Sequence, residues 1–117
     1  MLFDFEKFSN ITASVYPGGA YSLEGALSVF QYYFEKYEEH TGRQHPPIKA
    51  SQIVRICQDM PYIDRECSGG QYADIESEDY PVLIDRYFST KYRSCDRNIN
   101  HFFSGRIREL KFYEELY

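Results

Sequence analysis

The spacing of apolar residues predicts helices along most of this chain. Between residues 22 and 41, apolar side chains recur at steps of three and four, which places them on one face of a helix. Ser22 suits the N-cap, and Gly42 suits the left-handed residue that often follows a helix. The predicted buried face consists of Leu23, Ala26, Leu27, Phe30, Phe34 and Tyr37.

Two shorter segments, 49–60 and 77–92, show the same periodicity. Pro61 ends the first, and Pro81 suits the first turn of the second, where a missing N–H costs nothing. Residues 61–75 form a connector between them. The predicted buried positions are Ile53, Val54, Ile56, Cys57 and Met60 in the first helix, and Leu83, Ile84, Tyr87 and Phe88 in the second.

A fourth helix is predicted over residues 97–115. Its apolar residues lie 3, 4, 8, 11 and 14 positions after Ile99, which is a helical and not an alternating pattern. Gly105 inside it costs about 1 kcal/mol relative to alanine. It marks either a kink or a junction where Ser104 caps a new helix. The residues expected to be buried are Ile99, Phe103, Ile107 and Leu110.

The pattern of the first 21 residues is ambiguous. Phe3 and Phe5 alternate as in a strand, whereas Phe5 and Phe8 fit a helical turn. A chain of 117 residues suits one domain that buries about two-thirds of its unfolded surface. We therefore predict a mainly α fold, a compact single domain 1–117 of about four helices with an irregular N-terminal arm. The alternative is an α+β fold with a small N-terminal hairpin.

Composition narrows the setting in which the protein works. No run of 18 apolar residues exists, and the N-terminal segment is acidic where a signal peptide is basic. The three cysteines, Cys57, Cys67 and Cys95, are an odd number without close pairing, which favours free thiols in a reducing compartment. We therefore expect a cytoplasmic protein without a membrane partner.

Charge is unevenly distributed along the chain. Residues 1–85 hold 6 basic and 14 acidic side chains, a balance of −8, whereas residues 86–111 hold 7 basic and 2 acidic side chains, a balance of +5. Such an asymmetry produces a dipolar surface and bears on the choice of partner. The chain also has 12 tyrosines, a residue type that supplies large contact areas with a polar tip.

This basic and aromatic region predicts a non-enzymatic accessory protein that acts by protein–protein interaction, either with a partner or by self-association. The alternative is binding of a nucleic-acid backbone or single strand, against which the pI of about 5.1 argues. If the region binds, reversing Arg106 and Arg108 to Glu should abolish binding and leave the helical content unchanged. The predicted binding surface consists of Arg86, Lys91, Tyr92, Arg93, Arg97, His101, Arg106, Arg108 and Lys111.

Other chemistry has weaker support in the sequence. The cysteines and histidines are too irregularly spaced for a typical zinc module. Cys95 or Cys67 could pair with His101 as nucleophile and base, but no residue stands out as the third, orienting group. Neither Gly-Gly pair is followed by the Lys-Ser/Thr of a phosphate loop. We therefore expect no metal, no cofactor, no small-molecule substrate and no enzymatic activity.

Overall fold

The protein is mainly α-helical, as predicted. The computed structural model describes residues 4–16, 18, 21–64, 72–93, 95–104 and 107–116. A 3₁₀ helix, η2 (Ser77–Asp79), and two short strands, β1 (Tyr62–Asp64) and β2 (Tyr72–Asp74), accompany the helices. The helices within the described residues are α1 (Phe5–Val15), α2 (Leu23–Thr41), α3 (Ala50–Asp59), α4 (Tyr80–Ser89), α5 (Ile99–Phe102) and α6 (Ile107–Leu116).

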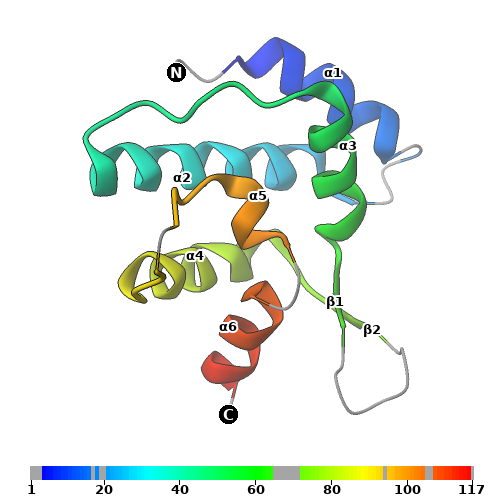
Figure 1. Ribbon diagram of the computed structural model, residues 1–117. Helices are drawn as coiled ribbons and strands as arrows, with labels where there is room; N and C mark the ends of the chain where they lie inside the picture. Colours follow the sequence, from blue (N-terminus) through cyan, green and yellow to red (C-terminus); the bar gives the residue numbers. More distant parts are fainter. Residues whose placement is uncertain are drawn as a thin grey trace.

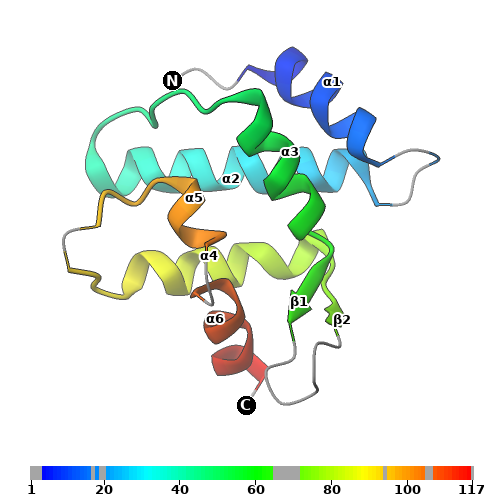
Figure 2. The ribbon, with the colours of Figure 1, turned by 45° about the vertical axis from the view of Figure 1, so that its right-hand side comes forward.

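The helices are arranged around α2 and α4, which run beside each other through the middle of the molecule (Figures 1 and 2). On one side of this pair, α1 packs against both α2 and α3. On the other side, α6 packs against α4 and β1. The short helix α5 lies over α2 and α4, where the Phe102 ring contacts the rings of Tyr33 and Tyr87.

Helix α2 has the ends that the sequence predicts. The Ser22 side chain accepts a hydrogen bond from the Gly25 N–H at 3.0 Å, which satisfies one of the unpaired amides of the first turn. Gly42 has a φ of 71°, a left-handed conformation that glycine adopts without steric cost. Its N–H donates to the Glu38 carbonyl at 2.8 Å and closes the helix.

The prediction of an irregular N-terminal arm is wrong, because residues 5–15 form α1. Asp4 caps this helix by accepting a hydrogen bond from the Lys7 N–H. The buried Phe8 ring packs edge-on against Phe30 and Phe34 of α2, at centroid distances of 4.9 and 5.7 Å. Of the two interpretations of the N-terminal pattern, the helical spacing of Phe5 and Phe8 is therefore the correct one.

The alternative of an N-terminal hairpin is also wrong, but a hairpin exists elsewhere. It lies in the predicted connector 61–75, where β1 pairs with β2 in antiparallel register. Tyr62 lies opposite Asp74, and Asp64 lies opposite Tyr72. Three residues a strand is too short to change the fold class.

The predicted helix 97–115 is interrupted in the structure. Helix α5 ends at Phe102, and α6 begins at Ile107. As expected, Ile99 and Phe103 are buried, and Ile107 is half-buried. Leu110, however, is 50% exposed, so its predicted burial is wrong. The interruption resets the helical phase and turns a different face of α6 inward.

The core is unusually rich in tyrosine, and its buried hydroxyls reach backbone carbonyls. Tyr33 donates to the Arg97 carbonyl at 2.8 Å, and Tyr80 donates to the Met60 carbonyl at 2.6 Å. Tyr16 donates to the carbonyl of Cys57 in the same way. A buried hydroxyl without a partner would be destabilising, so these bonds allow tyrosine to fill the core. Burial raises the pKa of these hydroxyls above its usual value, which keeps them protonated.

Candidate functional site

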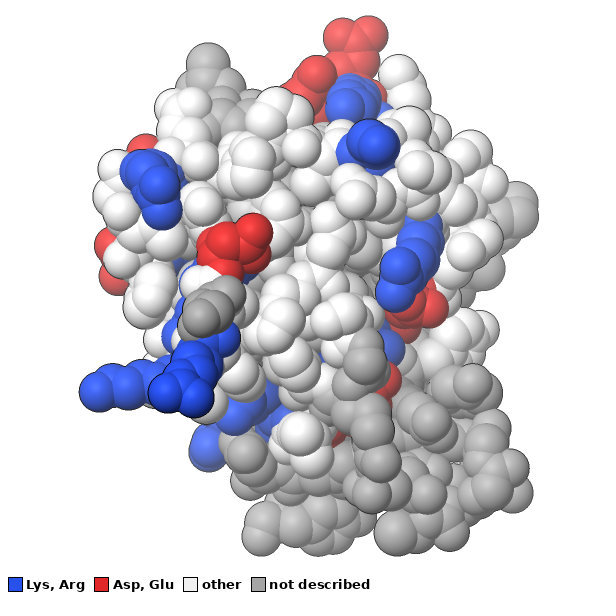
Figure 3. Space-filling model, viewed as in Figure 1, with Lys and Arg blue, Asp and Glu red and all other residues white. Residues whose placement is uncertain are grey.

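The described basic residues of segment 86–111 divide into an exposed group and a buried group. Arg86, Lys91 and Arg93 are exposed. They lie near the C-terminal end of α4 and on the loop that follows it, where Figure 3 shows Lys and Arg side chains gathered. We call these three residues the basic edge. They are the part of the predicted surface that the fold leaves accessible.

Arg97 belongs to the buried group, with only 8% of its surface exposed. Its guanidinium donates to the Tyr87 carbonyl at 2.7 Å and also to the Thr90 carbonyl, so it closes the C-terminal end of α4. The same group packs 5.0 Å from the ring centroids of both Tyr87 and Tyr92. Arg97 therefore holds the loop after α4 in place, and the prediction that it contributes to an open surface is wrong.

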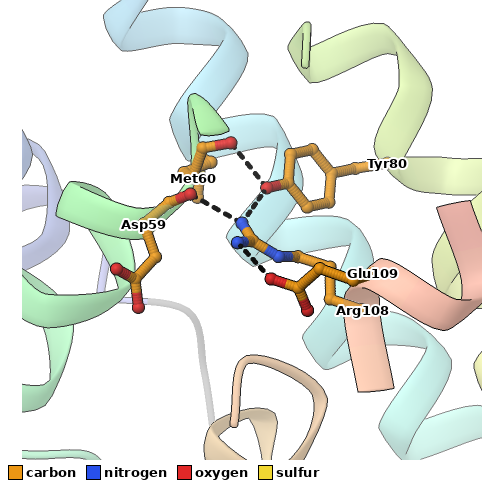
Figure 4. A network of polar contacts seen from close by, with 5 residues as sticks. All are labelled: Asp59, Met60, Tyr80, Arg108 and Glu109. Atoms are coloured by element: carbon orange, nitrogen blue, oxygen red, sulfur yellow. Dashed lines mark hydrogen bonds and ion pairs between the residues drawn. The ribbon is translucent and has the colours of Figure 1, made fainter. Parts of the chain in front are cut away.

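Arg108 is also buried, at 5% exposure, and joins three parts of the fold (Figure 4). Its Nη1 atom donates to the Asp59 carbonyl at 2.6 Å and to the Tyr80 hydroxyl at 2.8 Å. Its Nη2 atom lies 3.3 Å from a carboxylate oxygen of Glu109. Burial by itself would lower the pKa of Arg108, but Tyr80 and Glu109 outweigh it and the pKa lies above its usual value. Arg108 is a structural cation.

Lys111 completes the buried group. Its exposure is 6%, and its ammonium donates to the Thr90 hydroxyl at 2.8 Å. The ammonium also lies 5.9 Å from the centroid of the Tyr92 ring. Arg108 and Lys111 are three residues apart in α6, and both are turned inward. Their prediction as accessible binding residues is wrong, because the interruption before α6 turns their side of the helix toward the core and Leu110 toward solvent.

The remaining predicted positions have mixed outcomes. Tyr92 and His101 are half-buried, and their rings contact each other edge-on at 5.2 Å. Arg106 lies outside the described residues. The proposed test by joint reversal of Arg106 and Arg108 is unsuitable, because a glutamate in the place of Arg108 would bury a carboxylate opposite the Asp59 carbonyl.

A second cluster of reactive side chains joins α4, the loop that follows it and α5. His101 Nδ1 is 3.3 Å from the Cys95 sulfur and 2.6 Å from the Tyr87 hydroxyl oxygen. The Tyr87 hydroxyl is itself 3.6 Å from the same sulfur. The sequence pointed to Cys95 and His101 but offered no third group. Tyr87 was assigned only to the apolar face of its helix, and a core position gives no sign of where its hydroxyl points.

His45, another side chain with metal-binding chemistry, is part of the core. Its Nδ1 lies 2.7 Å from the Pro46 carbonyl, and its Nε2 lies 2.9 Å from the Ile99 amide nitrogen. A carbonyl can only accept and an amide N–H can only donate, so the ring is neutral with its proton on Nδ1. Both nitrogens are thus occupied. Among the described residues, no three His, Cys, Asp or Glu side chains are grouped closely enough to hold a metal ion.

Two further findings bear on function. In the part of the chain that the structure describes, every helix is too short or too polar to cross a membrane. Comparison of the chain with protein-family models, curated proteins and solved structures gives no match.

Proposed function

We propose that this protein is a non-enzymatic binding protein, and that the basic edge contacts an acidic surface of a partner protein. The observation that carries the proposal is the exposure of Arg86, Lys91 and Arg93 together after the other described cations of this region have been used inside the fold. Arg97, Arg108 and Lys111 are buried and donate hydrogen bonds within the fold.

The local charge balance supports this proposal. Between residues 86 and 104, Asp96 is the one acidic residue in the sequence. The neighbouring Asp85 accepts a hydrogen bond from the Tyr32 hydroxyl at 2.6 Å and lies 3.3 Å from the ammonium of Lys36. Lys91 and Arg93 therefore place positive charge at an exposed edge of a chain that is acidic as a whole. The field of such charges steers an acidic partner and weakens with salt.

An acidic protein surface suits this edge better than nucleic acid does. Stacking on bases needs an accessible aromatic face. Tyr92, the aromatic residue between Lys91 and Arg93, packs against Tyr87 at a centroid distance of 5.2 Å and against His101. Its ring is engaged within the molecule. A few exposed cations without a stacking platform are typical of the rim of a protein interface, where arginine is a favoured residue.

The reduced thiols Cys57 and Cys95 support a cytoplasmic location for this interaction, and we include that location in the proposal. The partner would then be an intracellular protein with a clustered acidic surface. No cofactor or small-molecule substrate takes part in the proposed binding.

The proposal can be tested with the double variant Lys91→Glu/Arg93→Glu. Its matched control is Lys49→Glu/Arg55→Glu, which changes the net charge equally at two exposed positions around α3, away from the basic edge in Figures 1 and 2. Fluorescence anisotropy would be recorded with a labelled polyglutamate peptide and with labelled single-stranded RNA, at about 50 and 200 mM salt.

We expect the wild-type chain and the control to bind polyglutamate at low salt, and the Lys91/Arg93 variant to lose at least about tenfold in affinity. Equal losses in both variants would show that net charge alone is responsible and would contradict the basic edge as the site. Binding of RNA without binding of polyglutamate would favour the nucleic-acid alternative. Absence of binding to either probe at low salt would reject an accessible anion-binding edge.

A further inference from the structure

The Cys95 sulfur is surrounded by hydrogen-bond donors. The Arg97 amide N–H donates to it at 3.3 Å, and His101 Nδ1 and the Tyr87 hydroxyl lie 3.3 and 3.6 Å away. Three groups that can donate a proton converge on one sulfur atom. Cys95 itself is half-buried, so solvent can still reach this part of the molecule.

The protons of this cluster can be arranged so that all three groups donate to the sulfur. Burial raises the pKa of Tyr87, so its hydroxyl keeps its proton. If the thiol proton moves to His101 Nδ1, the imidazolium N–H lies between the sulfur and the Tyr87 oxygen, which is 2.6 Å from that nitrogen. Tyr87 can then direct its own proton to the sulfur. An ion pair of thiolate and imidazolium leaves each of these groups with a partner.

Arg97 fixes this geometry through its backbone and its guanidinium bonds. Its φ of 62° is a left-handed conformation that is sterically unfavourable for a residue other than glycine. The bonds from its guanidinium to the carbonyls of Tyr87 and Thr90 hold it there. In this conformation its backbone N–H points to the Cys95 sulfur, and its guanidinium stays against Tyr87.

Cys57 provides the opposite case within the same chain. It is fully buried, and the Thr12 hydroxyl, 3.4 Å away, is its side-chain hydrogen-bond partner. Burial raises the pKa of the Cys57 thiol, which keeps it protonated. It is an inert core residue, so it serves as an internal reference for the reactivity of Cys95.

We propose that Cys95 is a reactive thiol that hydroperoxides oxidise to a sulfenic acid. The thiolate sulfur attacks one oxygen of the hydroperoxide, so an S–O bond forms and the O–O bond breaks. His101 passes its Nδ1 proton to the departing oxygen, which leaves as water or an alcohol. Sulfur loses two electrons and the peroxide gains them. The Arg97 N–H and the Tyr87 hydroxyl remain as donors to the oxidised group.

The first test compares the two cysteines in the folded and unfolded chain. The whole chain with Cys67→Ser is treated with hydrogen peroxide at neutral pH, with and without urea, and sulfenic acid is trapped with dimedone. Mass spectrometry then follows the labelling of Cys95 and of Cys57. A free cysteine is only a few per cent thiolate at neutral pH. Because the donors around the sulfur favour its attack as a thiolate, we expect folding to accelerate the oxidation of Cys95 about tenfold relative to the unfolded chain.

Folding should slow the reaction of Cys57 in the same samples. A Cys95 that reacts no faster in the folded chain than in urea overturns the proposal. This comparison uses the native residues of the cluster, so it decides the matter even if variants of the cluster fail to fold.

The second test removes the proton carrier. His101→Gln should bring the rate at Cys95 down to about its value in urea, whereas the matched control His40→Gln, at an exposed position, should leave it unchanged. Tyr87→Phe should slow the reaction by a smaller factor, since one donor is lost. If His101→Gln retains the helical circular dichroism spectrum and also the wild-type oxidation rate, the role of the imidazole is rejected.

Discussion

The guanidinium of Arg108 donates a hydrogen bond to the hydroxyl of Tyr80, 2.8 Å away, and so ties α6 to α4 (Figure 4). The Tyr80 hydroxyl passes the connection on to the Met60 carbonyl at the end of α3. An arginine that looks like a surface charge in the sequence is thus the centre of a buried network.

Arg108→Ala should lower the free energy of unfolding by about 2–4 kcal/mol, because it removes charged hydrogen bonds and leaves the Asp59 carbonyl without this donor. Urea denaturation followed by far-UV circular dichroism measures the change. The matched control is Arg93→Ala at the exposed basic edge, which should change stability by no more than about 0.5 kcal/mol. Equal stability of the two variants would contradict a structural role for Arg108.

Acid should destabilise the fold through His45. Burial lowers the pKa of His45 in the folded chain below its unfolded value of about 6.5, so the folded state binds the proton less well. The stability from the neutral ring is complete above pH 6.5 and decreases as the pH falls from there toward the folded pKa, by at most about 1.4 kcal/mol per pH unit. Urea denaturation between pH 7.5 and 5.5 measures this slope, which should become shallower in His45→Gln.

Gly25→Ala should destabilise the protein although alanine is the better helix former. An added Cβ would lie 2.3 Å from the Ser77 hydroxyl oxygen and 2.9 Å from the Ser77 Cβ, closer than such atoms can approach. We expect a loss of about 1–3 kcal/mol, as in other overpacked sites. Combining it with Ser77→Gly removes both obstructing atoms. A double-mutant cycle that shows no coupling between positions 25 and 77 would refute this contact.

Leu110→Gln should leave the free energy of unfolding within about 0.5 kcal/mol of the wild type, because the side chain is half exposed to solvent. Phe102→Ala, which empties a buried position between α2 and α4, should cost about 3–5 kcal/mol. Thermal or urea denaturation of the pair distinguishes the interrupted helix from a continuous one, in which Leu110 would lie in the core.

Apolar periodicity predicts a helix correctly where local residues also fix its ends. The ends of α2 were predicted accurately, because Ser22 caps its N-terminus and Gly42 ends it through interactions with the neighbouring backbone only. The prediction failed after Phe102, because counting from Ile99 assumes one unbroken helix. A break of a few residues changes the direction in which every later side chain points from the helix axis. Leu110, which was predicted to be buried, is exposed, and Lys111, which was predicted to be accessible, is buried.

The candidate sites were predictable to a different degree. Residue types alone pointed to Cys95 and His101, and the charge asymmetry pointed to the exposed Lys91 and Arg93. The sequence could not distinguish the exposed Lys91 and Arg93 from the buried Arg97. The residue type alone does not show whether a basic side chain faces water or donates to a buried carbonyl. That distinction depends on long-range packing, here between the loop after α4 and the Tyr87 ring.

The tyrosine hydroxyls that reach backbone carbonyls also bear on how the chain folds. Tyr16 and Cys57 are 41 residues apart, and Tyr33 and Arg97 are 64 apart. These bonds close large loops, so they can form only after the helices have docked. Near-ultraviolet tyrosine signals should therefore change together in one transition, when the helices dock.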